Sequence, residues 1–412
     1  MENQGLTKEM ISVNNALNTI VSNAKKLRNE KIPILESLGR VASENVYAKI
    51  NNPPQNVSSM DGYAVRYSNL KNLHKKPIKI IGESSAGKPY TKKIDNYECI
   101  RIFTGASVPS NTNVILLQEK VLIKKNFITN TTQNYNKNQY IRKKGSNFKK
   151  KSLILKKNNS ISSRKIGLLI SANHTEIKVF IKPKIAILAT GNEIRKNNKN
   201  LKNGIISSNT PLLISLLKSL GSDPYDIGIA KDSTISLKNK LININDYNIL
   251  ITTGGASVGR HDLVKDVLIE LGMKLIFWKI AMRPGKPLIF GVLKNTLILG
   301  FPGNPVSTYV SSLIFLKPLI NRYYQNNIET PIKQGFTEKP LIKNDERQEY
   351  LRAKAYLDNN KYFLSSVSKQ DSSMTSSLSR ANALIIREPF AKALKKGSKV
   401  SFILFSDIHT HI

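Results

Sequence analysis

The hydrophobic positions of residues 11–27 recur at the spacing of an amphipathic helix. In ISVNNALNTIVSNAKKL the apolar side chains fall three or four positions apart, and Ser12 is placed to cap the first turn. From about residue 50 to 180 the pattern changes to short apolar runs such as PIKII, ECIRIF, NVILLQE and IKVFIK, separated by Gly, Pro, Asn and Lys. The chain therefore predicts an N-terminal helix and then an irregular, mostly β region.

Residues 181–325 alternate short apolar strands with helical segments, which is typical of a parallel sheet covered on both faces. KIAILAT leads into a polar loop with Glu193, YNILITT breaks into GGASVG, and LILG runs into FPGNP. Asn209 is expected to cap the helix TPLLISLLKSL, and Gly221 to end it. Three loops thus leave the C-terminal ends of strands, where open α/β sheets bind ligands. After residue 327, YLRAKAYL, ALIIRE and KVSFILF predict a C-terminal β domain.

The length of 412 residues exceeds what one hydrophobic core supports, so two to four domains are expected. The sequence has no apolar run of about 18 residues and no signal-peptide pattern at its start. A cytoplasmic protein without a membrane span is expected.

The cysteine and histidine content narrows the possible metal chemistry. Cys99 is the only cysteine, and the five histidines show no helical or finger-like ligand spacing. An intrachain disulfide is excluded, and a zinc or iron–sulfur site is disfavoured. If a metal acts here, carboxylates and substrate phosphates should hold it, and Mg²⁺ is the natural candidate.

The net charge of +36 is spread along the chain, as in IRKNNKNLKNG. A basic surface attracts nucleic acid, anionic lipid or acidic small molecules. Because no basic motif with interleaved aromatic residues occurs, a solvated basic surface is favoured over a dedicated nucleic-acid site.

The sharpest local signal is the segment from Thr253 to Gly259, TGGASVG, between a buried strand and a helix. Its glycines allow close backbone approach, and free amides at a helix start favour an anion, although a simple tight turn explains the same pattern. Three carboxylates stand just after a predicted strand or at the start of a predicted helix: Glu193, Asp232 and Asp262. Together they could position a divalent cation on a polyphosphate. Taken singly, each carboxylate reads as a cap or turn residue.

Three cations, Lys279, Arg283 and Lys286, surround a proline-glycine turn in KIAMRPGKP. Such groups stabilise phosphates and similar oxyanions, while a solvated charge run is the alternative. The PGNP segment, with Pro302 and Pro305, adds a rigid loop before a helix. Two further segments, SMDGYA and TGA, read by their chemistry alone as turns.

Taken in order, SSMDGYAVR, RIFTGASVP, ILATGNEI, LITTGGASVG, MRPGKP and GFPGNPVS resemble the bacterial molybdopterin molybdenumtransferase family, MoeA, which has gephyrin as an animal relative. The resemblance implies a multidomain α/β and β fold: a doubly wound α/β molybdopterin-binding domain, a mixed helical domain, an inserted β domain and a C-terminal β barrel. These domains are expected at 181–326, at 1–49 with 148–180, at 50–147 and at 327–412, respectively.

The resemblance also implies a homodimer with its active cleft at the subunit interface. The reaction implied inserts molybdate into adenylylated molybdopterin, which a molybdopterin adenylyltransferase supplies. Magnesium assists cleavage of the pyrophosphate bond, and AMP leaves. Cofactor sulfurs would hold the molybdenum, which agrees with the single cysteine.

Residue roles follow from positions within the matched motifs. The resemblance places Asp61 and Thr104 in the active cleft and makes Glu193, Asp232 and Asp262 metal or water-positioning residues. The remaining expected roles are anion binding by Lys279, Arg283 and Lys286, pterin-phosphate binding by Gly254, Gly255 and Ser257, cleft shaping by Pro302 and Pro305, and a weaker contribution from Arg352 and Ser372.

The chain departs from its relatives at two places. Relatives commonly carry acidic residues where this sequence has Ser146 and Asn147, and an aspartate where it has Ser207. The loss of carboxylates is expected to weaken magnesium binding. Alternative functions are a molybdopterin-binding scaffold without transfer, a phosphoanhydride hydrolase that reuses the α/β domain and, last, a nucleic-acid binder.

Overall fold

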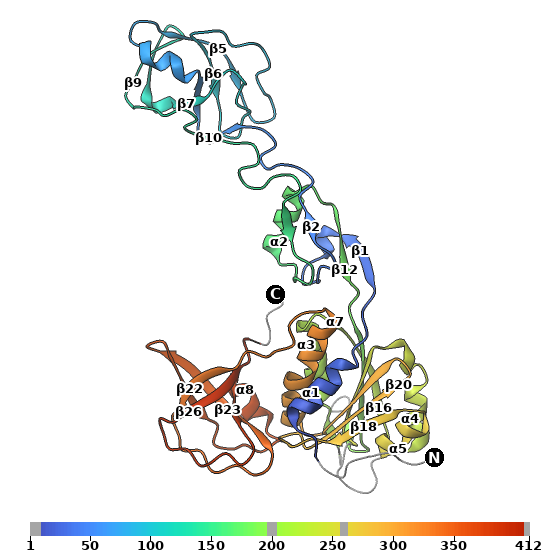
Figure 1. Cartoon of the computed structure of the whole chain (residues 1–412). Helices are drawn as coiled ribbons and strands as arrows, with labels where there is room; N and C mark the ends of the chain where they lie inside the picture. Colours follow the sequence, from blue (N-terminus) through green and yellow to red (C-terminus); the bar gives the residue numbers. More distant parts are fainter. Residues whose placement is uncertain (1–9, 196–203, 256–262, 408–412) are drawn as a thin grey trace. The chain divides into compact units, whose positions relative to one another are not determined.

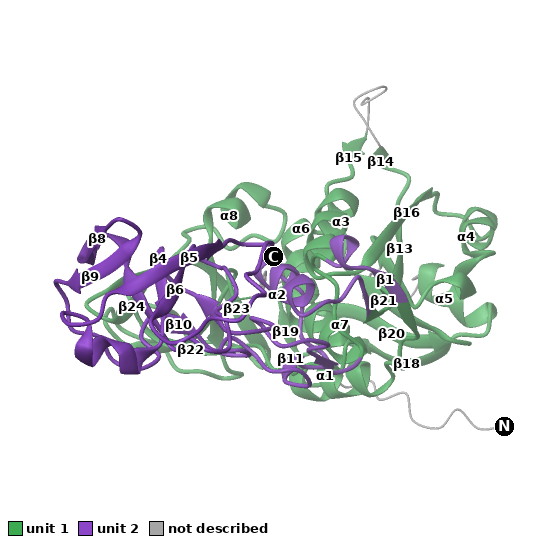
Figure 2. Ribbon diagram, turned by 90° about the horizontal axis from the view of Figure 1, so that it is seen from above, with its two compact units in different colours: residues 1–30, 38–43, 178–412 green, residues 31–37, 44–177 purple. Residues whose placement is uncertain are grey.

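The computed structural model describes residues 10–195, 204–255 and 263–407, and Figure 1 follows the chain through its elements. Contacts divide the chain into two compact units (Figure 2). Unit 1 comprises residues 1–30, 38–43 and 178–412, and unit 2 comprises residues 31–37 and 44–177. Of the four boundaries between the units along the chain, the first and the last fall within two strands, β1 (Asn29–Pro33) and β12 (Glu176–Phe180).

A six-stranded sheet in the order β16-β13-β17-β21-β20-β18 forms the centre of unit 1. Its first four strands are parallel, and β20 and β18 are antiparallel to their neighbours. In chain order the strands are β13 (Lys184–Thr190), β16 (Asp223–Ala230), β17 (Ile249–Thr253), β18 (Lys274–Lys279), β20 (Pro287–Leu293) and β21 (Thr296–Phe301). Both faces of this sheet are buried, as the continuous apolar runs predict.

Alternate residues of β13 enter two different hydrophobic cores. Ile185 and Ile187 join one core, while Ala186 and Leu188 join the other. Helices cover both faces of the sheet, as the ribbon in Figure 1 shows. The first face is covered by α1 (Val13–Ser22), α3 (Asn209–Ser219), α6 (Pro305–Ser311), the π-helix η5 (Ser312–Leu316) and α7 (Lys317–Tyr323), and the second by α4 (Thr234–Leu241) and α5 (Leu263–Glu270).

The predicted N-terminal helix is confirmed as α1. Ser12 caps it, because the Ser12 hydroxyl accepts a hydrogen bond from the Asn15 amide at 3.2 Å. Ala16 and Ile20 are fully buried in the same core as the first face of the sheet. The amphipathic pattern therefore buries its apolar face against the α/β domain.

The prediction that Asn209 caps the helix TPLLISLLKSL, which is α3, is wrong. Asn209 is the first residue inside α3, and Ser208 holds the cap position. The Asn209 side chain instead donates a hydrogen bond to the Gly303 carbonyl at 2.7 Å. The side chain of Asn209 therefore contacts the loop after β21 and caps no helix end.

Five strands close into a barrel in the C-terminal part of unit 1. The order β23-β24-β22-β26-β25 returns to β23, and the short strand β19 (Met282–Arg283) pairs in parallel with β23. The barrel strands are β22 (Lys333–Thr337), β23 (Gln348–Asp358), β24 (Lys361–Ser366), β25 (Ala383–Arg387) and β26 (Lys399–Leu404), with helix α8 (Thr375–Arg380) between β24 and β25. Leu384 and Ile403 of the barrel belong to the same core as α6 and α7.

Unit 2 is built around a six-stranded sheet in the order β7-β4-β6-β5-β9-β8. In chain order these strands are β4 (Gly62–Val65), β5 (Ile78–Ser84), β6 (Glu98–Ile102), β7 (Val114–Leu117), β8 (Val121–Lys124) and β9 (Phe127–Thr131). Smaller elements of the unit are η1 (Ile34–Glu36), β2 (Val46–Tyr47), β3 (Val57–Ser58), η2 (Tyr67–Asn72), η3 (Gln118–Lys120), β10 (Ile141–Arg142), β11 (Leu153–Leu155) and α2 (Ser163–Ser171). The mostly β character predicted for this part of the chain is confirmed.

The remaining elements of unit 1 are short: β14 (Ile194–Arg195), β15 (Ile205–Ile206) and η4 (Ile244–Asp246). Among the helices of the described ranges, none has the length and apolar character needed to cross a membrane.

Candidate active site

Three loops meet at one edge of the central sheet, as the strand pattern predicts. They follow the adjacent parallel strands β13, β17 and β21. Gly254, after β17, lies against Gly303, after β21, because a Cβ on Gly303 would be 3.5 Å from the Gly254 Cα. The Thr308 hydroxyl of α6 donates a hydrogen bond to the Pro302 carbonyl at 2.7 Å, which holds the loop after β21 against α6. The carboxyl edge of the sheet therefore has a fixed backbone shape.

Both glycines of the β17 loop have backbone conformations that other residues rarely adopt. Gly254 has a φ of +87° and Gly255 a φ of +67°. A Cβ on Gly254 would lie 2.3 Å from the Thr190 carbonyl oxygen, and one on Gly255 would lie 2.6 Å from Val264 Cγ2. Close approach to β13 thus requires glycine here. Ser257 lies outside the described residues, so its expected contact with a pterin phosphate stays a prediction.

Two of the predicted metal-binding carboxylates follow adjacent strands. Glu193 comes after β13 and Asp232 after β16, and these strands pair in parallel. Asp232 Oδ2 accepts a hydrogen bond from the Asn192 amide at 3.1 Å, and Asn192 Oδ1 accepts one from the Asp232 amide at 3.2 Å. The two loops are therefore fastened to each other.

The side chains of Glu193 and Asp232 fit a hard divalent cation, because both offer carboxylate oxygens as ligands. Within the described ranges no three His, Cys, Asp or Glu side chains gather in one place to hold a metal ion. The third expected carboxylate, Asp262, lies outside those ranges, so the three-carboxylate site stays a prediction.

A cavity of about 870 Å³ lies in unit 1 between the α/β domain and the barrel. Its walls combine the proline-glycine turn after β19, the PGNP loop and barrel segments. Five cationic side chains line it against two carboxylates, Glu349 and Asp371; the cations are Arg283, Lys286, Lys339, Arg347 and Arg352. The cavity is therefore suited to an anionic ligand.

The three cations predicted around the proline-glycine turn have different surroundings. Lys286 lines the cavity, as do Pro302 and Ser372. Arg283 is held by Glu349 at 2.7 Å and Asp345 at 3.3 Å. Lys279 does not line the cavity, and its ammonium lies 4.1 Å from the centre of the Trp278 ring. Pro305 begins α6.

Arg352 and Ser372 both bind parts of the protein itself. The Arg352 side chain is 1% exposed and donates hydrogen bonds to the Ser377 hydroxyl at 2.6 Å and to Gln370 Oε1 at 3.2 Å. Burial lowers the pKa of its guanidinium. The Ser372 hydroxyl accepts a hydrogen bond from the Asn304 side chain at 2.9 Å, which ties the barrel to the PGNP loop.

Sequence reasoning missed several cavity residues of the barrel. Lys339, Arg347 and Glu349 line the cavity but were not singled out. They stand in PLIKNDERQEYL and just before it, where charged residues alternate without a recognisable motif. The parallel pairing of Arg283 with Glu349 across β19 and β23 brings that segment to the turn. The sequence contains no local signal for this pairing.

Asp61 and Thr104, predicted together in the active cleft, contact each other in unit 2. The Thr104 amide and hydroxyl both donate to Asp61 Oδ1, at 2.7 and 2.8 Å. These hydrogen bonds, the amide first, hold the pKa of Asp61 below its ordinary value. Strand pairing explains the contact, since Gly62 of β4 faces Ile102 of β6. What this pair approaches in unit 1 stays a prediction.

Three family models match the chain in order. They describe the MoeA N-terminal region, domains I and II, at residues 11–173; a probable molybdopterin binding domain at 186–322; and the MoeA C-terminal region, domain IV, at 335–405. The chain is 30% identical to a molybdopterin molybdenumtransferase of Haemophilus influenzae over 92% of this chain and 94% of that protein.

Other known proteins agree with these matches. A gephyrin of Dictyostelium discoideum is 29% identical over 98% of this chain and 64% of its own length. A solved MoeA molybdopterin biosynthesis protein from Pyrococcus horikosii has a TM-score of 0.84 at 28% identity and covers 96% of this chain and 99% of its own. The chain belongs to the MoeA family, as its ordered motifs predicted.

Proposed function

We propose that this protein is a molybdopterin molybdenumtransferase, which inserts molybdate into adenylylated molybdopterin and releases AMP. The observation that carries the proposal is the cation-lined cavity beside the glycine and proline loops of the sheet edge, in a chain of the MoeA family. Molybdate and the phosphate anhydride are both anionic, so one electrostatic environment serves both substrates.

The residues of unit 1 have different proposed roles, which follow from their chemistry. Gly254 and Gly255 let the loop pack closely against Thr190 and Val264. The backbone of this loop would bind the pterin phosphate. Lys286 attracts the oxyanion into the cavity, where Glu349 neutralises Arg283. Pro302 and Pro305 fix the direction of the loop before α6. Orientation of the two substrates then contributes much of the rate.

Magnesium is proposed as the metal. Glu193 and Asp232 would hold it, together with Asp262, and the bound ion would neutralise charge on the phosphate anhydride. The fit rests on two carboxylates whose loops are joined by the reciprocal Asn192 and Asp232 hydrogen bonds. Asp61 and Thr104 are proposed to complete the cleft, and the hydrogen bonds from Thr104 stabilise the carboxylate form of Asp61 and lower its pKa.

The wider setting is proposed from the family. The protein would act as a homodimer in the cytoplasm and receive adenylylated molybdopterin from a molybdopterin adenylyltransferase. Its domains would be residues 1–49 with 148–180, 50–147, 181–326 and 327–412.

The test incubates the purified full-length protein with adenylylated molybdopterin and magnesium, with and without molybdate, and measures AMP and molybdenum cofactor. Molybdate-dependent AMP release with active cofactor is the expected result. AMP release that ignores molybdate would establish a hydrolase instead, and tight binding without AMP release a scaffold.

Two lysine variants test whether the cavity takes part in the reaction. Lys286→Gln removes a cavity charge and should lower AMP release at limiting molybdate by about tenfold or more, since charge-assisted contacts are worth about 1.5–3 kcal/mol. Lys274→Gln, at an exposed position of β18, removes the same charge away from the cavity and should leave the rate unchanged. Equal effects of both variants would remove the cavity from the mechanism.

A further inference from the structure

A second cavity, of about 430 Å³, lies in the C-terminal barrel next to the first. The two cavities share Lys339 and the segment Ser366–Ser368, which therefore forms the partition between them. Neither the family motifs nor the proposed reaction uses the residues that line only the second cavity.

The lining of the second cavity is cationic and rich in hydroxyl groups. It contains Lys339, Lys354, Lys369 and Arg380 and no carboxylate, together with five serines. The Ser377 hydroxyl already donates to the Met374 carbonyl at 2.8 Å, so the other four serines are the hydroxyl groups considered for a ligand. None of the four cations forms an ion pair with a carboxylate in the described ranges. Lys339 donates to the Ser366 carbonyl at 3.3 Å and Arg380 to the Ser376 carbonyl at 3.2 Å, so both keep further N–H groups for a ligand.

The cavity has a built floor. Lys354 of β23 pairs directly with Ser365 of β24, which places the two residues side by side on the barrel wall. On the same strand the buried Arg352 donates to the Ser377 hydroxyl at 2.6 Å and to the Lys369 carbonyl at 3.3 Å. Arg352 therefore fixes the backbone that carries Lys369 and the start of α8, two segments that line the cavity.

Several unpaired cations in one concave place repel one another, and an anion relieves that repulsion. Ammonium, guanidinium and hydroxyl groups together are the donors that tetrahedral oxyanions accept. We propose that the second cavity is a binding site for a tetrahedral oxyanion, either a free ion such as molybdate or phosphate or the phosphoryl group of a larger molecule. Its position places that anion beside the first cavity, with Lys339 common to both.

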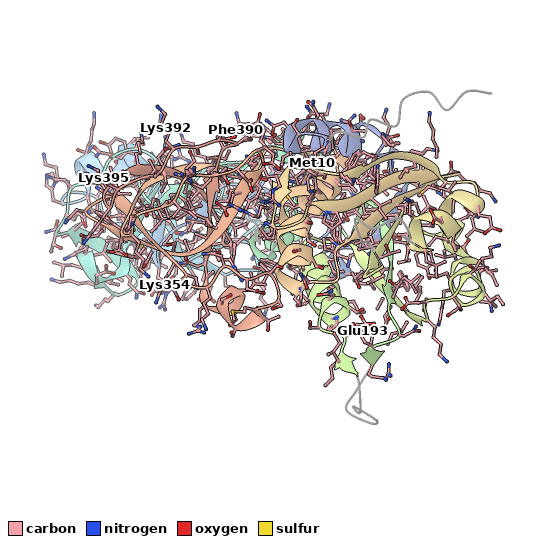
Figure 3. All side chains as sticks on the ribbon, turned by 90° about the horizontal axis from the view of Figure 1, so that it is seen from below. Met10, Glu193, Lys354, Phe390, Lys392 and Lys395 are labelled. Atoms are coloured by element: carbon pink, nitrogen blue, oxygen red, sulfur yellow. The ribbon has the colours of Figure 1, made fainter. Side chains whose placement is uncertain are left out.

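The experiment uses the full-length protein with tungstate, a heavy analogue of molybdate, at about 0.15 M salt so that diffuse charge is screened. Lys354→Gln with Lys369→Gln removes two charges that line only the second cavity. The matched control is Lys392→Gln with Lys395→Gln, which removes two charges from the same barrel but from neither cavity. Figure 3 shows Lys354 on the opposite side of the barrel from Lys392 and Lys395.

Crystals soaked in tungstate should show an anomalous tungsten peak against Lys354 and Lys369. Calorimetry should find that the first double variant weakens tungstate binding at this site by about tenfold or more, while the control binds like the parent. Equal weakening in both variants would reduce the effect to overall charge, and a peak absent from the second cavity would overturn the proposal outright.

Competition identifies the source of the anion. Displacement of tungstate by inorganic phosphate and molybdate, but not by AMP at the same concentration, assigns the site to a free oxyanion; stronger displacement by AMP assigns it to a phosphoryl group. The tungsten peak is read without turnover, so failure of the transferase assay and failure of this proposal are separate results.

Discussion

Arg283 illustrates how the surroundings of one residue modify an expectation drawn from its type. The turn KIAMRPGKP predicts three anion-binding cations, yet Arg283 lies among Asp345, Glu349 and Asn344. These contacts fasten the turn to the barrel and offset much of its charge. Lys286 lines the cavity without an acidic partner among the described residues, and is therefore the stronger of the two candidates for binding an incoming anion.

Asp345 should make the free energy of unfolding depend on pH in the acidic range. The hydrogen bond from Arg347 is the main reason that its pKa is lowered to about 2, against about 3.9 in an unfolded chain. A carboxylate with a lowered pKa stabilises the fold above about pH 4, and the contribution disappears as the pH falls toward about 2. Asp345→Asn should therefore lower the free energy of unfolding at neutral pH and reduce its loss between about pH 4 and 2.

Chemical denaturation at a series of pH values measures this effect. The control is Asp358→Asn at the end of β23, a carboxylate that forms no ion pair within the described part of the chain. A constant difference between Asp345→Asn and the parent from neutral pH down to about pH 2 would show that the ion pairs contribute nothing.

At the scale of elements, strands were predicted well where apolar runs were continuous. β13, β17 and β21 lie where KIAILAT, YNILITT and LILG indicated them, because burial on both faces leaves a strong signal. The π-helical turn η5 between α6 and α7 and the amide contact of Asn209 had no such signal. Both depend on neighbours that lie far away in the chain.

The loop after β17 provides the prediction at this scale. Gly254→Ala forces a positive φ on alanine and places its Cβ 2.3 Å from the Thr190 carbonyl oxygen. We expect a loss of about 1–3 kcal/mol in the free energy of unfolding and lower AMP release, because the loop must move.

Gly303→Ala is the matched control in the loop that touches Gly254. Its Cβ would meet the Gly254 Cα at an ordinary 3.5 Å, so stability should change by about 0.5 kcal/mol or less. Thermal unfolding of both variants measures the contrast. Similar melting temperatures for the two would mean that the β17 loop adapts freely and that its glycines have no steric role.

For the whole molecule, the two units have separate hydrophobic cores. Ile100 is fully buried in a core of unit 2, and Ile251 is fully buried in a core of unit 1. Ile100→Ala should lower the stability of its unit by about 2–5 kcal/mol, because it removes apolar contacts and leaves a cavity. Ile251→Ala should do the same to unit 1.

Hydrogen exchange followed by mass spectrometry reports on each unit separately. Ile100→Ala should speed exchange in β4 to β7 and leave β13, β17 and β21 protected, and Ile251→Ala should give the reverse. If either variant sped exchange equally across both units, the chain would unfold as one cooperative body.

The sequence by itself determined the elements with strong periodic patterns, the glycine loop, the family and, through the family, the proposed chemistry. These are local properties, since a strand buried on both faces or a glycine at a tight approach leaves its mark within a few residues. The resemblance also placed Asp61 and Thr104 in the active cleft. Their mutual hydrogen bonds come from the tertiary structure, and their place in a cleft stays a prediction.

Only the tertiary structure decided what surrounds each charge. Pairing of β19 with β23 brings Arg283 to Glu349, and barrel closure puts Lys354, Lys369 and Arg380 around one cavity. Electrostatic environment depends on distances between side chains from different segments. A chain with 64 Lys and Arg residues does not reveal in its sequence which cations find a carboxylate and which stay free for an anion.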